Sequence, residues 1–342
     1  MESNNTQTSD TEQSAPVIEQ PIIAEAKPPK RKLKIALIAS VVALVIISAG
    51  VVAFALSSTN IPENEAPAVT QVDTTETTPD APEAAEPINP SSIPLGDGKY
   101  GSEPRAGYIY SCQSNFNGPG AFKEGPWIDT TKGVWSKSGK NVTVNGDVTW
   151  ENAEFTINQT EQTRDLIGNG LPINHGTGTF PISSSDDAYS YDRNPNSIRS
   201  QSVSVSLPLN PTVKSEPTCL SMGPIGYSTN GVALYNALDA GGRDAAAHEI
   251  QDTCGGHPER SGSYHYHDYS DCINDVESEE PLLVGYALDG FGIFKYEQNP
   301  TNAELDECHG KTGQVMWDGK MVTMYHYVVT TEYPYTLGCL RG

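Results

Sequence analysis

The longest apolar segment of the chain is residues 35–56, a run without any charged side chain. A helix rises about 1.5 Å per residue, so this run can span a bilayer core of about 30 Å. Five basic residues lie within residues 27–34, whereas no lysine or arginine follows the run before Lys99. The positive-inside rule therefore predicts a single-pass transmembrane helix in the cell membrane, with residues 1–34 as a cytoplasmic, disordered tail and the remaining chain outside.

A cleaved signal peptide is the alternative interpretation of this segment. Ala53-Phe54-Ala55 has the small-x-small pattern of a cleavage site. However, secretory signals usually have an apolar core of about 7–15 residues, which is shorter than residues 35–56. The length of the run, and the long polar tail before it, favour a signal anchor that stays in the mature protein.

Residues 57–98 form the next compositional block, which is rich in threonine, glutamate, proline and alanine. Proline interrupts regular hydrogen bonding, and neighbouring glutamates repel one another. Few apolar side chains are present to offset the entropy that is lost on ordering. This composition predicts a disordered stalk that holds the following domain away from the membrane surface.

Beyond residue 98, short apolar runs alternate with turn-forming residues, and no long amphipathic helical pattern occurs. Residues 142–144 and 147–150 flank Asn145-Gly146, a sequence typical of a β-hairpin. Residues 202–207 alternate polar and apolar side chains, as a half-buried strand does.

Two further patterns complete the predicted fold class. Residues 154–158 continue the strand pattern, and residues 245–251 indicate a short helix. We therefore expect one extracytoplasmic domain, residues 99–342, that is mainly β with short helices and long loops.

The net charge of −22 lies entirely beyond the apolar segment, because the first 56 residues contain as many basic as acidic side chains. Phosphate recognition requires clustered lysine and arginine, so this acidity argues against nucleic acid as a partner. The partners that we expect are the membrane, through residues 35–56, and a cell-surface ligand. An acidic surface also attracts cations, although its simplest role is to keep an exported domain soluble.

All six cysteines follow the apolar segment. An even number on one side of a membrane indicates an oxidising compartment and disulfide bonds. The Cys-x-x-Cys spacing of redox and zinc motifs is absent from the sequence. The cysteines allow many pairings among which spacing alone does not choose, and the candidates are Cys112, Cys219, Cys254, Cys272, Cys308 and Cys339.

The segment Tyr264-His265-Tyr266-His267 carries the most distinctive chemistry of the chain. Alternate residues of a strand share a face, so both histidines would lie on one side and both tyrosines on the other. Two imidazoles at this spacing can bind one transition metal ion, Zn or Cu, if further ligands complete the coordination. The candidate metal ligands are His265, His267, His257 and His326, with His175 and His309 as additional histidines, and Asp252 and Asp289 as carboxylates that orient a ligand.

A metal-free interpretation stays open beside this one. Tyrosine and histidine that alternate on a strand can form a hydrogen-bonded ladder, which stabilises a core without any ion. The domain would then be a non-catalytic module for binding or adhesion at the cell surface, to which exposed tyrosines are suited. Asp289-Gly290 likewise has a simpler interpretation as a tight turn. No hydrolase elbow, zinc-protease motif or phosphate loop is present, so the sequence leaves enzymatic activity undecided.

Several segments closely resemble the YHYH domain family, which is named for the tetrapeptide at residues 264–267. The resemblance implies an extracytoplasmic domain with a histidine site and no established reaction. The similar segments run in order between about residues 142 and 342, and they are NGLPINHGTGTFP (169–181), YDRNPNSI (191–198), DTCGGHPERSGSYHYH (252–267), PLLVGYALDGFGIF (281–294), LDECHG (305–310) and YPYTLGCLRG (333–342).

The resemblance also implies a second copy of the tetrapeptide near the C-terminus. This chain has Tyr325-His326-Tyr327-Val328 at that position, so one histidine of the family pattern is replaced by Val328. An Asp-x-Cys-x-Gly segment precedes each copy, which suggests an internal repeat. If both copies supplied one metal site, the replacement would remove a ligand from it.

A cysteine follows each copy of the motif, and this arrangement leads to a prediction of the disulfide pairing. We pair Cys254 with Cys272 and Cys308 with Cys339, which leaves Cys112 with Cys219. A bond between Cys254 and Cys308 would instead indicate that the two repeats pair symmetrically.

Overall fold

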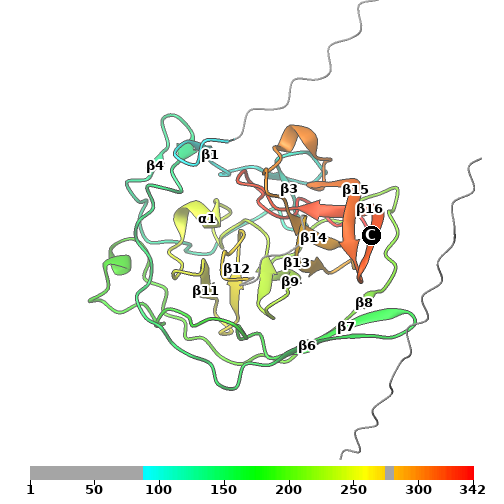
Figure 1. Ribbon diagram of the computed structural model, residues 1–342. Helices are drawn as coiled ribbons and strands as arrows, with labels where there is room; N and C mark the ends of the chain where they lie inside the picture. The colour runs from blue at the N-terminus through cyan, green and yellow to red at the C-terminus, as the bar shows by residue number, and fades with distance from the viewer. Residues whose placement is uncertain (1–87, 274–280) are drawn as a thin grey trace, which may run out of the picture. The chain divides into compact units, whose positions relative to one another are not determined.

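The computed structural model of the chain describes residues 88–273 and 281–342 (Figure 1). These residues belong to one unit, Thr77–Gly342. The predicted cytoplasmic tail, the transmembrane helix predicted at residues 35–56 and most of the predicted stalk lie outside the described residues. Within the two described ranges, no helix is long and apolar enough to cross a membrane.

An eight-stranded mixed sheet forms the central part of the fold, with the strand order β11-β12-β10-β9-β13-β14-β16-β15 (Figure 1). Its strands are β9 (Pro224–Ser228), β10 (Ala233–Tyr235), β11 (Gly256–Pro258), β12 (Tyr264–Tyr266), β13 (Leu282–Ala287), β14 (Gly292–Lys295), β15 (Gly310–Trp317) and β16 (Lys320–Val328).

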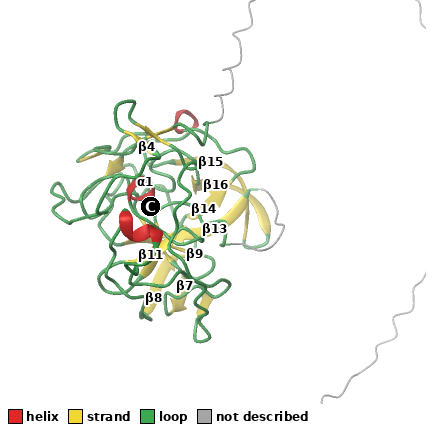
Figure 2. Cartoon of the chain, turned by 90° about the vertical axis from the view of Figure 1, so that its left-hand side faces the viewer, coloured by secondary structure: helices red, strands yellow, loops and turns green. Residues whose placement is uncertain are grey.

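Three smaller sheets and three short helical segments complete the described fold. Loops and turns connect them and make up much of the described chain, as Figure 2 shows. The smaller strands are β1 (Ile93–Pro94), β2 (Tyr100–Gly101), β3 (Ile109–Tyr110), β4 (Ile128–Asp129), β5 (Val134–Trp135), β6 (Phe155–Gln159), β7 (Thr163–Gly168) and β8 (Val203–Pro208). The helical segments are α1 (Ala245–His248) and the 3₁₀ turns η1 (Asp187–Ser190) and η2 (Asn302–Glu304).

The eight-stranded sheet consists of two copies of one four-stranded arrangement. β9 and β13 pair antiparallel at its middle, with Tyr227 opposite Tyr286. In the first copy, β9 and β10 form an antiparallel hairpin, and β12 pairs in parallel with β10. In the second copy, β13 and β14 form the hairpin, and β16 pairs in parallel with β14. An antiparallel edge strand then completes each copy, β11 beside β12 and β15 beside β16. The order is therefore symmetric about the centre, which confirms the internal repeat that the sequence suggested.

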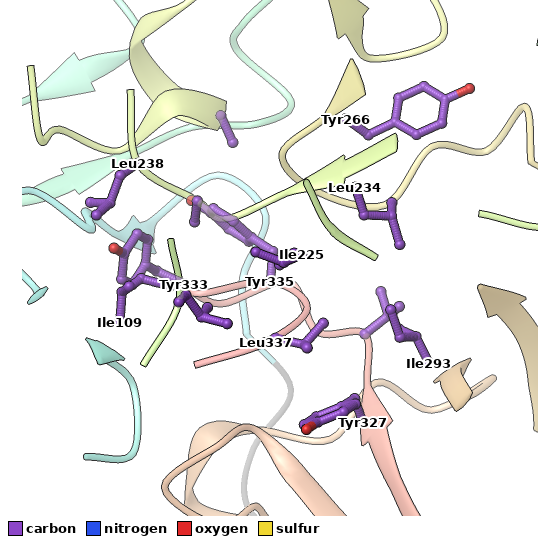
Figure 3. Close-up of a cluster of buried hydrophobic side chains, with 14 of the residues drawn as sticks. Ile109, Ile225, Leu234, Leu238, Tyr266, Ile293, Tyr327, Tyr333, Tyr335 and Leu337 are labelled. Carbon is purple, nitrogen blue, oxygen red and sulfur yellow. The ribbon is translucent and has the colours of Figure 1, made fainter. Parts of the chain in front are cut away.

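Equivalent residues occupy equivalent registers in the two copies. Leu234 is opposite Tyr266 in the first copy, and Ile293 is opposite Tyr327 in the second. All four side chains lie in one buried cluster (Figure 3). The two halves of the repeat thus share a single core, so neither copy buries its apolar face alone.

The hairpin turns of the two copies both contain a glycine with a positive φ angle. Asn230-Gly231 joins β9 to β10, and Asp289-Gly290 joins β13 to β14. Gly231 and Gly290 have φ angles of 88° and 94°, a region that side chains with a Cβ rarely adopt. Asp289 is therefore a turn residue, as the simpler of the two sequence interpretations held.

Several local predictions are confirmed, and one is wrong. The predicted strands appear as β6 and β8, and α1 lies inside the segment predicted to be helical. The hairpin around Asn145-Gly146 does not form. Val144 instead bridges Asp252 in parallel, and Val148 bridges Thr177 in antiparallel. Local turn propensity was overridden because each half of the expected hairpin finds a partner far away in the sequence.

The end of the predicted stalk needs a correction. Ile93–Pro94 pairs with Val134–Trp135, and the Ile93 side chain is fully buried. The folded part therefore begins before residue 99.

Candidate metal centre

The β11–β12 hairpin brings three histidines together. His257 on β11 lies directly opposite His265 on β12, and His267 follows two residues later on the same face. The potential ligand atoms of the three rings all lie within 4.8 Å of one another, and every ring is buried. The alternation of residues 264–267 thus places its histidines as predicted, and the hairpin adds the third.

The loop before β11 has a fixed shape because Asp252 organises it. Its carboxylate accepts hydrogen bonds from the backbone N–H groups of Cys254 and Gly256 and from the Tyr264 hydroxyl. A Cβ at position 256 would collide with the Tyr264 ring, so only glycine permits this approach. Asp252 therefore positions the hairpin through backbone and tyrosine contacts rather than by bonding a histidine.

A disulfide bond closes the hairpin at its outer ends. Cys254 is joined to Cys272, Cys308 to Cys339 and Cys112 to Cys219. All six cysteines of the chain lie in the described part and are paired, which confirms the predicted connectivity. The Cys254–Cys272 bond joins the segment before β11 to the segment after β12. It therefore holds β11, which carries His257, beside the strand that leads through His265 to His267.

Hydrogen bonds determine which ring nitrogens carry protons. The Nδ1 atom of His265 lies 3.0 Å from the Ser263 carbonyl oxygen, and that of His267 lies 2.6 Å from the Asn236 carbonyl oxygen. A carbonyl oxygen can only accept, so each Nδ1 donates a proton. In a neutral imidazole the Nε2 atom is then an unprotonated lone pair. These two Nε2 atoms are 3.1 Å apart.

Burial keeps the cluster uncharged. It lowers the pKa of His257, and likewise the pKa of His265, well below the usual range, and the neighbouring rings add to this effect. The pKa of His267 is also lowered by burial. Neutral rings are the form that binds a metal ion.

Glu249 is the residue that the sequence analysis missed. Its Oε2 atom lies 3.4 Å from His267 Nε2 and 3.5 Å from His257 Nε2. The residue follows α1 directly, and its side chain keeps 15% of its exposure. The carboxylate reaches the hairpin because Glu249 lies at the C-terminal end of α1. The sequence spacing between Glu249 and the histidines does not indicate this contact.

An aromatic ring covers one side of the cluster. Tyr235 at the end of β10 stacks on His265, with the ring centroids 3.8 Å apart. Burial raises the pKa of Tyr235 to about 12, so the hydroxyl stays protonated at neutral pH. The ring contributes packing and orientation to His265.

The second copy lacks this cluster. His326 is opposite Lys311, as His265 is opposite His257, and Val328 follows where His267 follows His265. β16 and β12 are separated by four intervening strands. His326 was predicted as a ligand of the same site, and the structure contradicts this, because the two copies lie on opposite halves of the sheet.

The other candidate residues also have different partners. Both nitrogens of His175 are used, Nδ1 by the Gly176 carbonyl and Nε2 by the Tyr266 hydroxyl. His175 lies near Cys254 and Cys272, but those sulfurs form a disulfide and do not act as thiolate ligands. His309 contacts Thr330. Asp289 accepts from the Tyr327 hydroxyl and from backbone N–H groups, so it orients no histidine.

These features define a disulfide-bonded, mainly β domain with a buried cluster of three neutral histidines. The model of the family described as YHYH protein matches residues 204–304, so the chain contains a YHYH domain. This segment includes the three histidines and is shorter than residues 142–342, over which the sequence resemblance extended. No curated protein matches the chain. No solved structure matches it either.

Proposed function

We propose that the domain binds a divalent transition metal ion through the Nε2 atoms of His257, His265 and His267. One observation carries this proposal, the 3.1 Å approach of two unprotonated Nε2 atoms. Two lone pairs at that distance repel each other unless a cation lies between them. Tetrahedral zinc with bonds of about 2.0–2.1 Å places its ligand nitrogens about 3.3–3.4 Å apart, which is close to this separation.

The remaining histidine of the cluster supports the same conclusion. Neither Nδ1 nor Nε2 of His257 has a hydrogen-bond partner within the described part of the chain. Buried polar atoms are normally paired, and an ion can account for one that is not. Donation from Nδ1 to a backbone carbonyl, as in His265 and His267, is also typical of metal-ligating histidines.

The alternative of a metal-free ladder fits other histidines of this chain better. Tyr296 contacts His326 Nε2 at 2.7 Å, and the His326 Nδ1 atom faces the Met324 carbonyl at 3.1 Å. His175 is paired at both nitrogens in a similar way. In these two rings both nitrogens have a partner, whereas both nitrogens of His257 are unpaired within the described residues.

Metal analysis of the purified full-length protein tests this proposal. We expect about one equivalent of bound zinc or copper, or its uptake on titration. His265→Gln removes a proposed ligand, and His326→Gln makes the same change at the equivalent position of the second copy. Loss of binding in the first variant alone supports the site. Well under one equivalent in the parent protein, with no uptake, contradicts it.

We further propose that the domain works outside the cell membrane, anchored by residues 35–56. The apolar run and the basic residues before it support this orientation. Three disulfide bonds are in keeping with an oxidising compartment. Protease added to intact cells should release the domain and leave the N-terminal tail protected. Recovery of a mature protein that begins near Leu56 would indicate a cleaved signal instead.

A further inference from the structure

A buried carboxylate oxygen beside the histidine cluster has no conventional partner. Glu249 Oε2 is enclosed, and no hydrogen bond to it occurs within the described residues. Its nearest polar neighbours at the cluster are the Nε2 atoms of His267 and His257, at 3.4 and 3.5 Å. His267 Nε2 carries no proton, because the proton of that ring is on Nδ1. The carboxylate therefore faces a lone pair rather than a donor.

The basic residues near Glu249 are occupied elsewhere. The Lys140 ammonium contacts the carbonyl oxygens of Ala246 and Glu249 and the Gln251 side-chain oxygen, all at 2.6–2.7 Å. The Arg243 guanidinium forms its ion pair with Asp239 at 2.8 Å. Burial, together with the nearby charges of Asp192 and Asp239, raises the pKa of Glu249 well above its ordinary value, so a charged carboxylate here is costly unless a cation binds beside it.

The backbone holds Glu249 in this position. α1 is a single turn whose N-terminus is capped by Asp244, and the Glu249 N–H donates to the Ala245 carbonyl. Lys140 binds two carbonyl oxygens at the C-terminal end of the same turn. His248, one residue earlier, is directed to Asp97 instead. The turn thus separates two adjacent side chains and directs the carboxylate toward the hairpin.

We propose that Glu249 is the fourth ligand of the metal centre, and this inference rests on the metal-binding function proposed above. Three neutral imidazoles and one carboxylate would give a closed, four-coordinate site. A divalent ion there compensates the charge of the buried carboxylate and leaves the site with one net positive charge. The ligand set contains nitrogen and oxygen but no sulfur, so it suits borderline divalent ions such as Zn²⁺ better than Cu⁺.

Substitution of Glu249 in the full-length protein tests this assignment with two readouts. The first is Zn²⁺ affinity, measured by competition with a chelator. The second is the visible absorption of bound Co²⁺, whose intensity is high in four-coordinate sites and falls when the coordination number rises. Glu249→Gln keeps the size of the side chain and removes the charge, whereas Glu249→Asp keeps the carboxylate. Glu161→Gln, on the exposed turn between β6 and β7, is the matched control.

We expect Glu249→Gln to lower Zn²⁺ affinity by at least about 10-fold, the loss seen even for residues that merely orient a ligand. The Co²⁺ spectrum should lose intensity in this variant, and Glu249→Asp should recover part of the affinity. Unchanged affinity and spectrum in Glu249→Gln would overturn the assignment and leave the three-histidine site intact. Absence of metal binding in the parent protein would instead refute the proposed function itself, and the fourth ligand with it. If Glu249→Gln fails to fold, Glu249→Asp decides the question. A lowered Zn²⁺ affinity with a changed Co²⁺ spectrum supports the assignment, and an affinity and spectrum equal to those of the parent overturn it.

Discussion

Tyr227 and Tyr286 lie directly opposite each other on β9 and β13, and this pair marks the centre of the repeat. The pairs on either side obey the same symmetry, because Gly285 faces Ser228 and Ala287 faces Gly226. The two copies can therefore be compared position by position. His257 corresponds to Lys311 and His267 to Val328, so the second copy has kept the scaffold and replaced two of three histidines.

The second copy should bind a metal ion when its histidines are restored. We expect Lys311→His combined with Val328→His to raise the bound metal from about one to about two equivalents, because His326 would gain both missing neighbours. Val328→His alone should add no binding, since the Lys311 ammonium repels a cation. Elemental analysis checks the stoichiometry, and thermal unfolding checks the fold. A folded double variant that still binds one ion would show that the second copy lacks the ligand geometry.

The disulfide bond Cys254–Cys272 should matter for metal binding as well as for stability. Its removal by a double serine substitution should lower the free energy of unfolding by about 3 kcal/mol, given the length of the loop that it closes. We also expect weaker Zn²⁺ binding, because β11 and β12 are no longer tied together beside the cluster.

Cys308–Cys339 provides the control for this experiment, since it is the equivalent bond of the second copy. The same substitution there should reduce stability by a slightly larger amount, about 4 kcal/mol, because the loop is longer, and it should leave metal affinity unchanged. An equal loss of affinity in both variants would mean that general destabilisation explains the effect.

His309 should make the fold sensitive to acid. Burial lowers the pKa of His309 to about 3, from 6.5 for an exposed ring. Between these values the unfolded chain binds a proton that the folded chain does not, so stability falls as pH decreases from 6.5 toward 3. The free energy of unfolding should fall by about 1.4 kcal/mol per pH unit in this range, a total of a few kcal/mol.

His309→Asn should flatten this acid dependence. His309 has a φ of 70°, a left-handed conformation that asparagine tolerates. The decisive measurement is urea unfolding of both proteins at several pH values below 6.5. The variant's stability should decline less steeply, and parallel curves would refute the contribution of His309.

Asp318 should stabilise the fold through a buried arginine. The Arg164 guanidinium lies 4.6 and 4.7 Å from the ring centroids of Tyr286 and Trp317, and it donates two hydrogen bonds to the Asp318 carboxylate. Asp318→Asn leaves this buried cation without an anionic partner and should cost about 1–3 kcal/mol, less than a fully buried pair because Asp318 is one-third exposed.

An exposed ion pair serves as the comparison for Asp318. Asp129 pairs with Lys132 at the surface, and Asp129→Asn should change stability little, because solvent screens such pairs. Chemical denaturation of both variants distinguishes the two cases. Equal losses would show that the Arg164 pair contributes no more than a surface contact.

The sequence predicted those parts of the site that depend on local periodicity. The alternation of residues 264–267 was sufficient to place His265 and His267 on one face, and the repeated Asp-x-Cys segments led to the disulfide pairing. Glu249 was not predictable in this way, because its approach depends on where a single helical turn packs. The hairpin expected around Asn145-Gly146 failed for a related reason, since Val144 and Val148 pair with distant segments. Local patterns do not encode such long-range competition.

The four proposed ligands all lie within residues 249–267, although the sheet around them joins segments from Pro224 to Val328. Closing a short loop costs less entropy than closing a long one, so the hairpin of β11 and β12 can assemble before the distant strands pair. An ion captured at that stage would order the first copy of the repeat early, and its binding energy would contribute to folding. The second copy, which has Lys311 and Val328, would lack this contribution, although it shares one hydrophobic core with the first copy. Metal availability would then affect how fast the protein folds as well as the stability of the folded state.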